Sequence, residues 1–286
     1  MGDQIIDQLL ALATSAGQWA WWLANTNFMI ALAGAAAGAA AGACAAQWIV
    51  ERRDRKRRLI EEIRATNVAI MLAFEIVNTF CALKSQHVRR LKQTFEAQRK
   101  ELDAVRVRSR TSPTPVGFEL KADFETLQLP QLPTTLMQTL LFEKISITAR
   151  PLSSFMNLLR SIDAFADAVR QRQGVIDWCK QHAPVGDDVL IPLYFGLPNA
   201  RGQQDRSYPD SIEAIAGYAD DCIFFSKSVM EDLVAHGTRM ARRYGRAAPR
   251  IHEPDFSKAM QQNLIPDRVH YADVMGAFRT TNARGA

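Results

Sequence analysis

Lysine and arginine are absent from the first 51 residues, in which Asp3, Asp7 and Glu51 are the only charged side chains. A cleavable signal peptide carries a positively charged stretch ahead of its apolar core. The absence therefore argues against such a peptide, although a long apolar run follows. Positive charge is concentrated further on, because residues 51–110 hold 16 Lys or Arg against 8 Asp or Glu.

Cysteine is scarce, and the four that occur, Cys44, Cys81, Cys179 and Cys222, are far apart in the sequence. A zinc site built from close-set cysteine pairs is excluded by this spacing, and so is a small secreted scaffold dense in disulfides. We therefore expect reduced thiols in a reducing compartment.

Local catalytic motifs are also missing. The sequence has no Walker-type phosphate loop, no Gly-x-Ser-x-Gly turn and no His-Glu-x-x-His helix. The enzyme classes that depend on these motifs are disfavoured, and we expect no cofactor and no metal. Active sites assembled from scattered residues leave no local motif, so an enzyme remains an alternative.

An apolar stretch at residues 28–50 contains 23 residues and no charge. About 20 such residues cross the hydrocarbon layer as a helix, so the stretch predicts a transmembrane helix. Trp19, Trp21 and Trp22 precede it, and tryptophan favours the headgroup region. With 48% hydrophobic residues and a mean hydropathy of -0.13, the chain as a whole is typical of a globular protein with one membrane segment rather than a polytopic transporter.

A basic run follows the apolar stretch directly, with six basic residues among positions 51–58. Basic flanks stay on the cytoplasmic side of a membrane, which predicts an outside amino-terminal segment (1–27) and a cytoplasmic body. The expected location is a bacterial inner membrane. The run is also predicted to contact anionic lipid headgroups; its members are Arg52, Arg53, Arg55, Lys56, Arg57 and Arg58.

A long juxtamembrane helix is predicted for residues 51–108, which contain neither Pro nor Gly. Two rows of positions seven residues apart, starting at Ile60 and Ile63, are apolar at eleven of fourteen places. This pattern predicts one apolar seam and a coiled coil or helical bundle. Residues 68–83 are apolar enough that a second membrane-spanning helix is an alternative. Inserting the Glu75 carboxylate into the bilayer would cost free energy, which disfavours this alternative.

The remaining chain divides by its prolines into a connector (109–133), a helical body (134–245) and an irregular tail (246–286). Within the body we expect helices over 134–147, from Pro151 to about His182, and from Pro209 to near Gly245. Residues 183–209 hold four prolines and three glycines and are predicted to be an irregular loop, with the apolar part 189–195 packed against the bundle. The fold class is therefore all-α, with one transmembrane helix that continues into a cytoplasmic bundle or hairpin.

Glycine recurs every fourth residue within the apolar stretch, at Gly34, Gly38 and Gly42. Small residues at this spacing let two helices approach closely in a membrane, which predicts self-association through this face. The same row could also be plain Ala/Gly filler. A nucleic acid is disfavoured as a partner, because no aromatic residues are interleaved with the residues of the basic run.

Four polar residues on the last long helix are the leading candidates for catalysis: Asp220, Asp221, Asp232 and His236. A weaker candidate is a loop site at His182, Asp187 and Asp188. A carboxylate and an imidazole four residues apart share a helix face and can form part of an acid–base pair or a metal site. Two such residues make an incomplete site, and the pair is also common on solvated helices.

These patterns favour a non-catalytic function. We expect a membrane-anchored cytoplasmic scaffold, sensor or effector that acts through self-association, lipid contact and contacts with an unidentified protein partner. A membrane-perturbing or pore-forming oligomer is the first alternative, based on the glycine row. A membrane-tethered enzyme that uses the four polar residues is the second.

Overall fold

The computed structural model describes residues 2–111, 117–147, 149–182 and 185–273. Within them, side chains are described at Trp21 and at all positions from Ile30 onward. In these residues the regular structure is entirely helical, which confirms the predicted all-α class. The chain divides into two compact units, residues 1–58 and residues 59–286, and each is described by itself.

The elements follow one another along the chain in this order: α1 Gly2–Leu83, the π-helical turn η1 Lys84–Val88, α2 Arg89–Thr111, α3 Thr134–Thr139, the π-helical turn η2 Leu140–Lys144, α4 Ala149–Gln181, α5 Asp187–Phe195, α6 Ser207–Tyr244, α7 Ser257–Gln261 and the 3-10 turn η3 Arg268–Tyr271.

The first unit consists of the amino-terminal part of α1. Side chains at positions 30–50 are all exposed, Ile30 by 69% and Trp48 by 60%. By length and composition, one helix in the described part of the chain, from Ile30 to Thr111, is apolar enough to cross a membrane. Its most apolar window is partly buried in the bundle, so this finding does not single out residues 30–50. A helix that is apolar on every side is stable only in an apolar environment.

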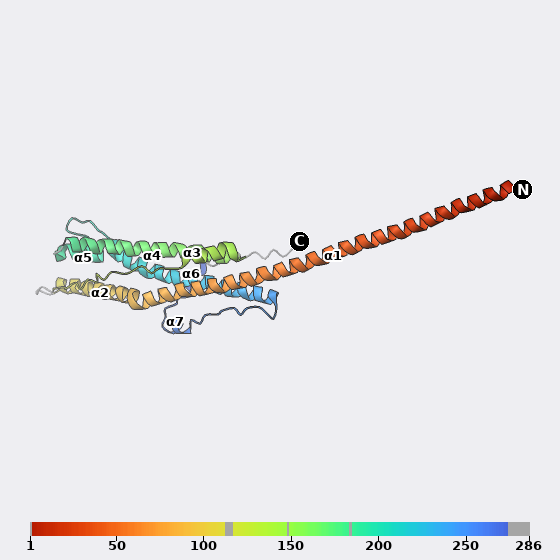
Figure 1. Cartoon of the computed structure of the whole chain (residues 1–286). Helices are drawn as coiled ribbons and strands as arrows, with labels where there is room; N and C mark the ends of the chain where they lie inside the picture. Colours follow the sequence, from red (N-terminus) through yellow and green to blue (C-terminus); the bar gives the residue numbers. More distant parts are fainter. Residues whose placement is uncertain (1, 112–116, 148, 183–184, 274–286) are drawn as a thin grey trace. The chain divides into compact units, whose positions relative to one another are not determined.

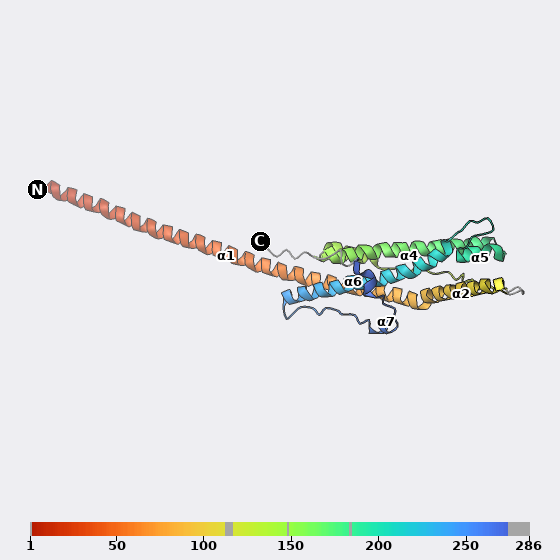
Figure 2. The same cartoon turned by 180° about the vertical axis from the view of Figure 1, so that it is seen from behind.

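Helix α6 is the centre of the second unit. Every side chain from Cys222 to Met230 is buried, so this stretch is enclosed on all sides. Figures 1 and 2, which view the molecule from opposite sides, both show α6 beginning between α4 and α2 and crossing α1 toward its carboxy-terminal end. The second unit is therefore a bundle built around α6.

The carboxy-terminal part of α1 contributes a broad face to this bundle. Its buried residues fall on neighbouring positions of successive turns: Ala69, Ile70, Ala73, Ile76, Val77, Phe80 and Cys81. They join residues of α4 and α6 in one hydrophobic core. The face is wider than a two-stranded seam and is typical of a bundle. Residues 68–83, considered above as a second span, lie in this segment, and Glu75 is exposed.

A π-helical turn interrupts the predicted long helix. The sequence predicted one unbroken helix over 51–108, whereas α1 ends at Leu83 and η1 separates it from α2. Both views show the chain changing direction there (Figures 1 and 2). The Lys84 ammonium at the start of η1 donates to the Asp220 carboxylate and to the Leu264 carbonyl oxygen, 3.0 Å away. The turn thus places a lysine toward α6.

The predicted irregular loop 183–209 contains a helix, so this prediction was wrong in part. Helix α5 spans Asp187–Phe195, with Gly186 before it and Gly196 in a left-handed conformation (φ 62°) after it. The glycines and prolines therefore bound a helix, because Gly196 supplies the positive φ of a helix end. Tyr194 and Phe195 are buried, as the predicted packing of this segment requires.

The predicted helix 134–147 is shorter than expected. Helix α3 and the π-helical turn η2 end at Lys144, and residues 145–147 are not helical. Met137, Leu141 and Ile145 are buried, whereas Leu136 from the predicted inner face is 52% exposed. The inward face is therefore the row Met137, Leu141 and Ile145, one position on from Leu136.

Arg172 of α4, only 3% exposed, fastens the described part of the connector to the bundle. Its guanidinium donates to the carbonyl oxygens of Asp123 and Glu125, each at 2.7 Å. The Tyr208 hydroxyl also donates to the Asp123 carbonyl oxygen, at 2.8 Å. A buried guanidinium is tolerated because carbonyl oxygens replace its water.

Candidate functional site

The candidate His236 of α6 belongs to a junction with Glu62 of α1 and Ser146 of the segment between η2 and α4. The same carboxylate oxygen, Glu62 Oε1, lies 2.9 Å from His236 Nε2 and accepts the Ser146 backbone N–H at 2.9 Å. It also accepts the Ser146 hydroxyl. Three segments distant in sequence are thus joined at one carboxylate.

The charge state of Glu62 follows from these bonds. Burial by itself raises the pKa of the Glu62 carboxyl. The hydrogen bonds from Ser146 and from His236 together lower it by more than burial raises it, so the pKa lies below its usual value of 4.5. The carboxylate is therefore ionised at neutral pH and accepts all three hydrogen bonds.

Serine, histidine and glutamate occur together here, but their order does not fit nucleophilic catalysis. In a catalytic triad the imidazole stands between the nucleophile and the acid. Here both Ser146 and His236 bond to Glu62, so neither activates the other. The arrangement can hold α1 against α6, and we assign it a structural role.

The other three candidate residues have separate partners. Asp232 lies 3.4 Å from Arg150 Nε in an ion pair; burial raises the pKa of this carboxyl, and Arg150 opposes the rise. Asp220 pairs with Lys84, and Asp221 accepts the Tyr271 hydroxyl at 2.8 Å.

The four candidates are also too far apart to act on one substrate group. Asp220 and Asp232 are twelve residues apart on α6, about 18 Å at 1.5 Å per residue. Among the residues that the structure describes, no group of three or more His, Cys, Asp or Glu side chains could hold a metal ion. The structure therefore does not bring the predicted residues together as one site.

The predicted association and lipid residues lie in the first unit. A Cβ atom added at Gly34, Gly38 or Gly42 would meet nothing within 4 Å, so this helix face is uncovered in the single chain. All residues at positions 51–58 are exposed, and the Arg52 guanidinium lies 5.2 Å from the centre of the Trp48 ring. Their positions permit contact with a second helix and with lipid headgroups.

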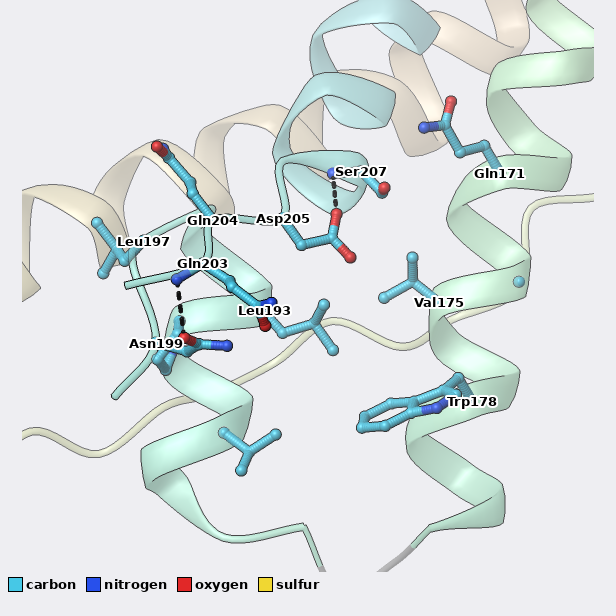
Figure 3. Close-up of a pocket in the computed structure, with 13 residues that line it drawn as sticks. Gln171, Val175, Trp178, Leu193, Leu197, Asn199, Gln203, Gln204, Asp205 and Ser207 are labelled. Carbon is cyan, nitrogen blue, oxygen red and sulfur yellow. Dashed lines mark hydrogen bonds between the residues drawn. The ribbon is translucent and has the colours of Figure 1, made fainter. Parts of the chain in front are cut away.

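A pocket of about 570 Å³ in the second unit was not predicted from the sequence. It lies between α4, α5 and the loop that joins α5 to α6 (Figure 3). Its lining residues are Gln171, Gly174, Val175, Trp178, Val189, Pro192, Leu193, Leu197, Asn199, Gln203, Gln204, Asp205 and Ser207. A volume of this size is typical of small-molecule sites.

The loop that forms one wall of the pocket is held by its own hydrogen bonds. The Asn199 side-chain oxygen accepts the backbone N–H groups of Arg201 and Gln203, at 2.9 and 3.0 Å. Asp205 accepts the Ser207 N–H at 2.8 Å where α6 begins. Figure 3 shows the Asn199–Gln203 and Asp205–Ser207 bonds beside the hollow. Because asparagine and aspartate bond to the backbone two residues on, these turns have a local sequence cause.

The opposite wall combines apolar and aromatic groups. Trp178 of α4 is 41% exposed although it lines the pocket, and Val189 of α5 is 44% exposed. In Figure 3 the Trp178 ring and the Leu193 side chain point into the space between α4 and α5. A hollow with apolar walls and a few polar groups can bind a small organic molecule.

No protein-family model matches the chain, and comparison with curated proteins and with solved structures likewise finds no match. Functional inference therefore rests on the chemistry of the residues themselves. The pocket is the best-formed candidate site, because it has both the volume and the mixed lining that ligand binding requires.

The Glu62 junction predicts a specific pH dependence of stability. The folded-state pKa of Glu62 is below its unfolded value. The stabilisation of the folded state by the Glu62 carboxylate is therefore complete above about pH 4.5 and is lost as the pH falls through the lowered pKa. We expect Glu62→Gln to lower the free energy of unfolding by about 1–2 kcal/mol at pH 7. Chemical denaturation of the full chain in detergent micelles measures this quantity.

The difference between wild type and Glu62→Gln should shrink as the pH is lowered from 5 toward 3, within the window set by the lowered pKa. The control is Glu75→Gln, on the same helix but exposed, which should cost less than about 0.5 kcal/mol. A Glu62→Gln deficit that grows on acidification would contradict the assignment.

Proposed function

We propose that the protein is a single-pass, membrane-anchored sensor that binds a small ligand in its helical body and acts through self-association and contacts with a protein partner, without catalysis. The observation that carries the proposal is the pocket of about 570 Å³ between α4 and α5. Residues 28–50 serve as the anchor, the amino terminus lies outside, and the body is cytoplasmic.

The anchor is supported by the surroundings of the apolar stretch. Side chains at positions 30–50 are exposed along a helix that is apolar on every side, and this surface is unfavourable in water. The exposed basic residues 52–58 follow it at once, where cytoplasmic flanks and anionic headgroups place positive charge. The candidate second span, 68–83, instead supplies much of the bundle core, which favours a single crossing.

A non-catalytic function is supported by the engagement of the polar candidates. Each of the four candidates binds a different group of the same chain, and each partner comes from a segment outside α6. The pairs are His236 with Glu62, Asp220 with Lys84, Asp221 with Tyr271 and Asp232 with Arg150. Side chains engaged in this way stabilise the bundle. In the pocket, the bond between Asp205 and Ser207 is made by the Ser207 backbone N–H, which is the bond of a turn.

Self-association is tested through the glycine row. We expect Gly38→Leu to lower the dimerisation affinity of the full chain in detergent by about tenfold, because the larger side chain prevents close approach of two helices. Ala36→Leu, on the other side of the helix, is the matched control and should leave the affinity within about twofold. Analytical ultracentrifugation measures both; equal affinities in the two variants would remove this face from the proposal.

Ligand binding is tested by filling the pocket. Gly174 lines it, and a Cβ atom added there meets nothing within 4 Å, so Gly174→Leu occupies the hollow without a clash. Replacing a helical glycine also favours the helix by about 0.5–1 kcal/mol, so the variant should fold. The matched control is Gly217→Leu, at an exposed helical glycine of α6 that also has open space around it.

The experiment screens a library of small metabolites against the full chain in lipid nanodiscs by thermal unfolding. A true ligand at about 100 times its Kd should raise the Tm of wild type and of Gly217→Leu by about 5 °C or more. The Gly174→Leu variant should show no shift. If every stabilising compound acts equally on Gly174→Leu, the pocket is not the binding site and the sensor proposal fails.

A further inference from the structure

We infer that the ligand of the α4–α5 pocket is a small organic ammonium ion with an apolar group attached, an inference that rests on the proposed sensor function. The class of ligand follows from three features of the lining: one unbalanced negative charge, one exposed indole ring, and an apolar wall. The charge and the indole ring both select a cation, and the apolar wall selects the hydrocarbon group.

The negative charge is that of Asp205, the single charged side chain among the residues that line the pocket. One carboxylate oxygen accepts the Ser207 N–H at 2.8 Å, and within the described residues Asp205 forms no ion pair. The neighbouring Arg206 turns to Asp210, 3.0 Å away, and is not part of the lining. The second carboxylate oxygen is therefore available to a cation, whereas an anionic ligand would meet repulsion with no basic group to balance it.

The aromatic feature is Trp178, which lines the pocket and is 41% exposed overall. The ring stacks against His182 of the next helical turn, with centres 4.6 Å apart, and points into the space between α4 and α5 (Figure 3). The negative face of an indole attracts ammonium groups, and this attraction is stronger for tryptophan than for other aromatic side chains. Trp178 and Asp205 thus favour a ligand of the same sign from two elements.

The apolar wall consists of Val175, Val189, Pro192, Leu193 and Leu197. An inorganic cation would leave this surface in contact with water, and a single carboxylate is too few ligands for Ca²⁺ or Mg²⁺. A molecule with an ammonium group at one end and a hydrocarbon group at the other satisfies both parts of the lining. The pocket is therefore matched to an amphiphilic amine.

The test compares three probes with the same apolar group and different charge: 3-phenylpropylammonium, 3-phenylpropanol and 3-phenylpropanoate. Isothermal titration calorimetry measures their binding to the full chain in zwitterionic nanodiscs, with empty nanodiscs subtracted. We expect the ammonium probe to bind with a Kd of about 0.1–1 mM. The alcohol should bind roughly tenfold more weakly, as one exposed ion pair and one cation–π contact together predict, and the carboxylate more weakly still.

Two variants assign the preference to its residues. Asp205→Asn retains an oxygen for the Ser207 N–H but removes the charge, so it should reduce the ammonium-over-alcohol preference to about threefold. Trp178→Leu retains apolar surface and should reduce the preference by a similar factor. Asp210→Asn, which removes the partner of Arg206 outside the pocket, should leave the preference unchanged. Circular dichroism confirms that each variant is folded.

The outcomes separate this inference from the sensor proposal. Equal binding of ammonium and alcohol, stronger binding of the carboxylate, or binding of none of the three probes overturns the ligand class. If the library screen nevertheless yields a neutral or anionic ligand that Gly174→Leu blocks, the sensor proposal stands without it. If an ammonium ligand binds and the Asp205→Asn variant keeps the full preference, the site has been placed wrongly.

Discussion

The structure of the body depends on the burial of α6 on every side between Cys222 and Met230. A helix surrounded in this way needs neighbours along its whole circumference, so α1, α4, α3 and the segment after α6 must all cover it. Its polar groups are satisfied inside the bundle: the Ser226 hydroxyl donates to the Cys222 carbonyl oxygen, and His236 bonds to Glu62.

The pocket lies away from this buried stretch, between α4, α5 and the loop that leads into α6. Helix α5 has nine residues, and the loop that follows it turns through Gly196 and Gly202, both with positive φ, before α6 begins. Tyr194 and Phe195 at the end of α5 pack into the core, while Val189 and Leu193 face the hollow beside Trp178. The same short helix therefore seals the core on one side and forms a pocket wall on the other.

Regular periodicity allowed much of the fold to be predicted from the sequence. The helix over α4, the start of α6 near Pro209 and its end at Gly245 were all expected, because each has an apolar face and a recognisable end. The two π-helical turns were not expected, since Lys84–Val88 and Leu140–Lys144 differ from their neighbours in hydrogen bonding rather than in composition. Helix α5 was missed because Pro192 lies inside it.

The candidate site was much less predictable. Asp232 and His236 attracted attention as a pair four residues apart, but their partners Arg150 and Glu62 come from distant segments that no local pattern connects to them. The pocket combines residues from α4, α5 and the following loop, all within residues 171–207, and its existence depends on how these segments pack. The signals available were single residues: an exposed tryptophan on an otherwise amphipathic helix, and the turn-forming Asn199 and Asp205.

The central claim is that the chain crosses the membrane once and leaves its body on the cytoplasmic side. A membrane-impermeant maleimide tests it in intact cells that express the full chain with its four cysteines replaced by alanine. Single cysteines are introduced as Asp3→Cys before the apolar stretch and as Lys258→Cys at an exposed position of α7. The account predicts that the first is labelled in intact cells and the second only after permeabilisation. Labelling of both positions in the same compartment would contradict it.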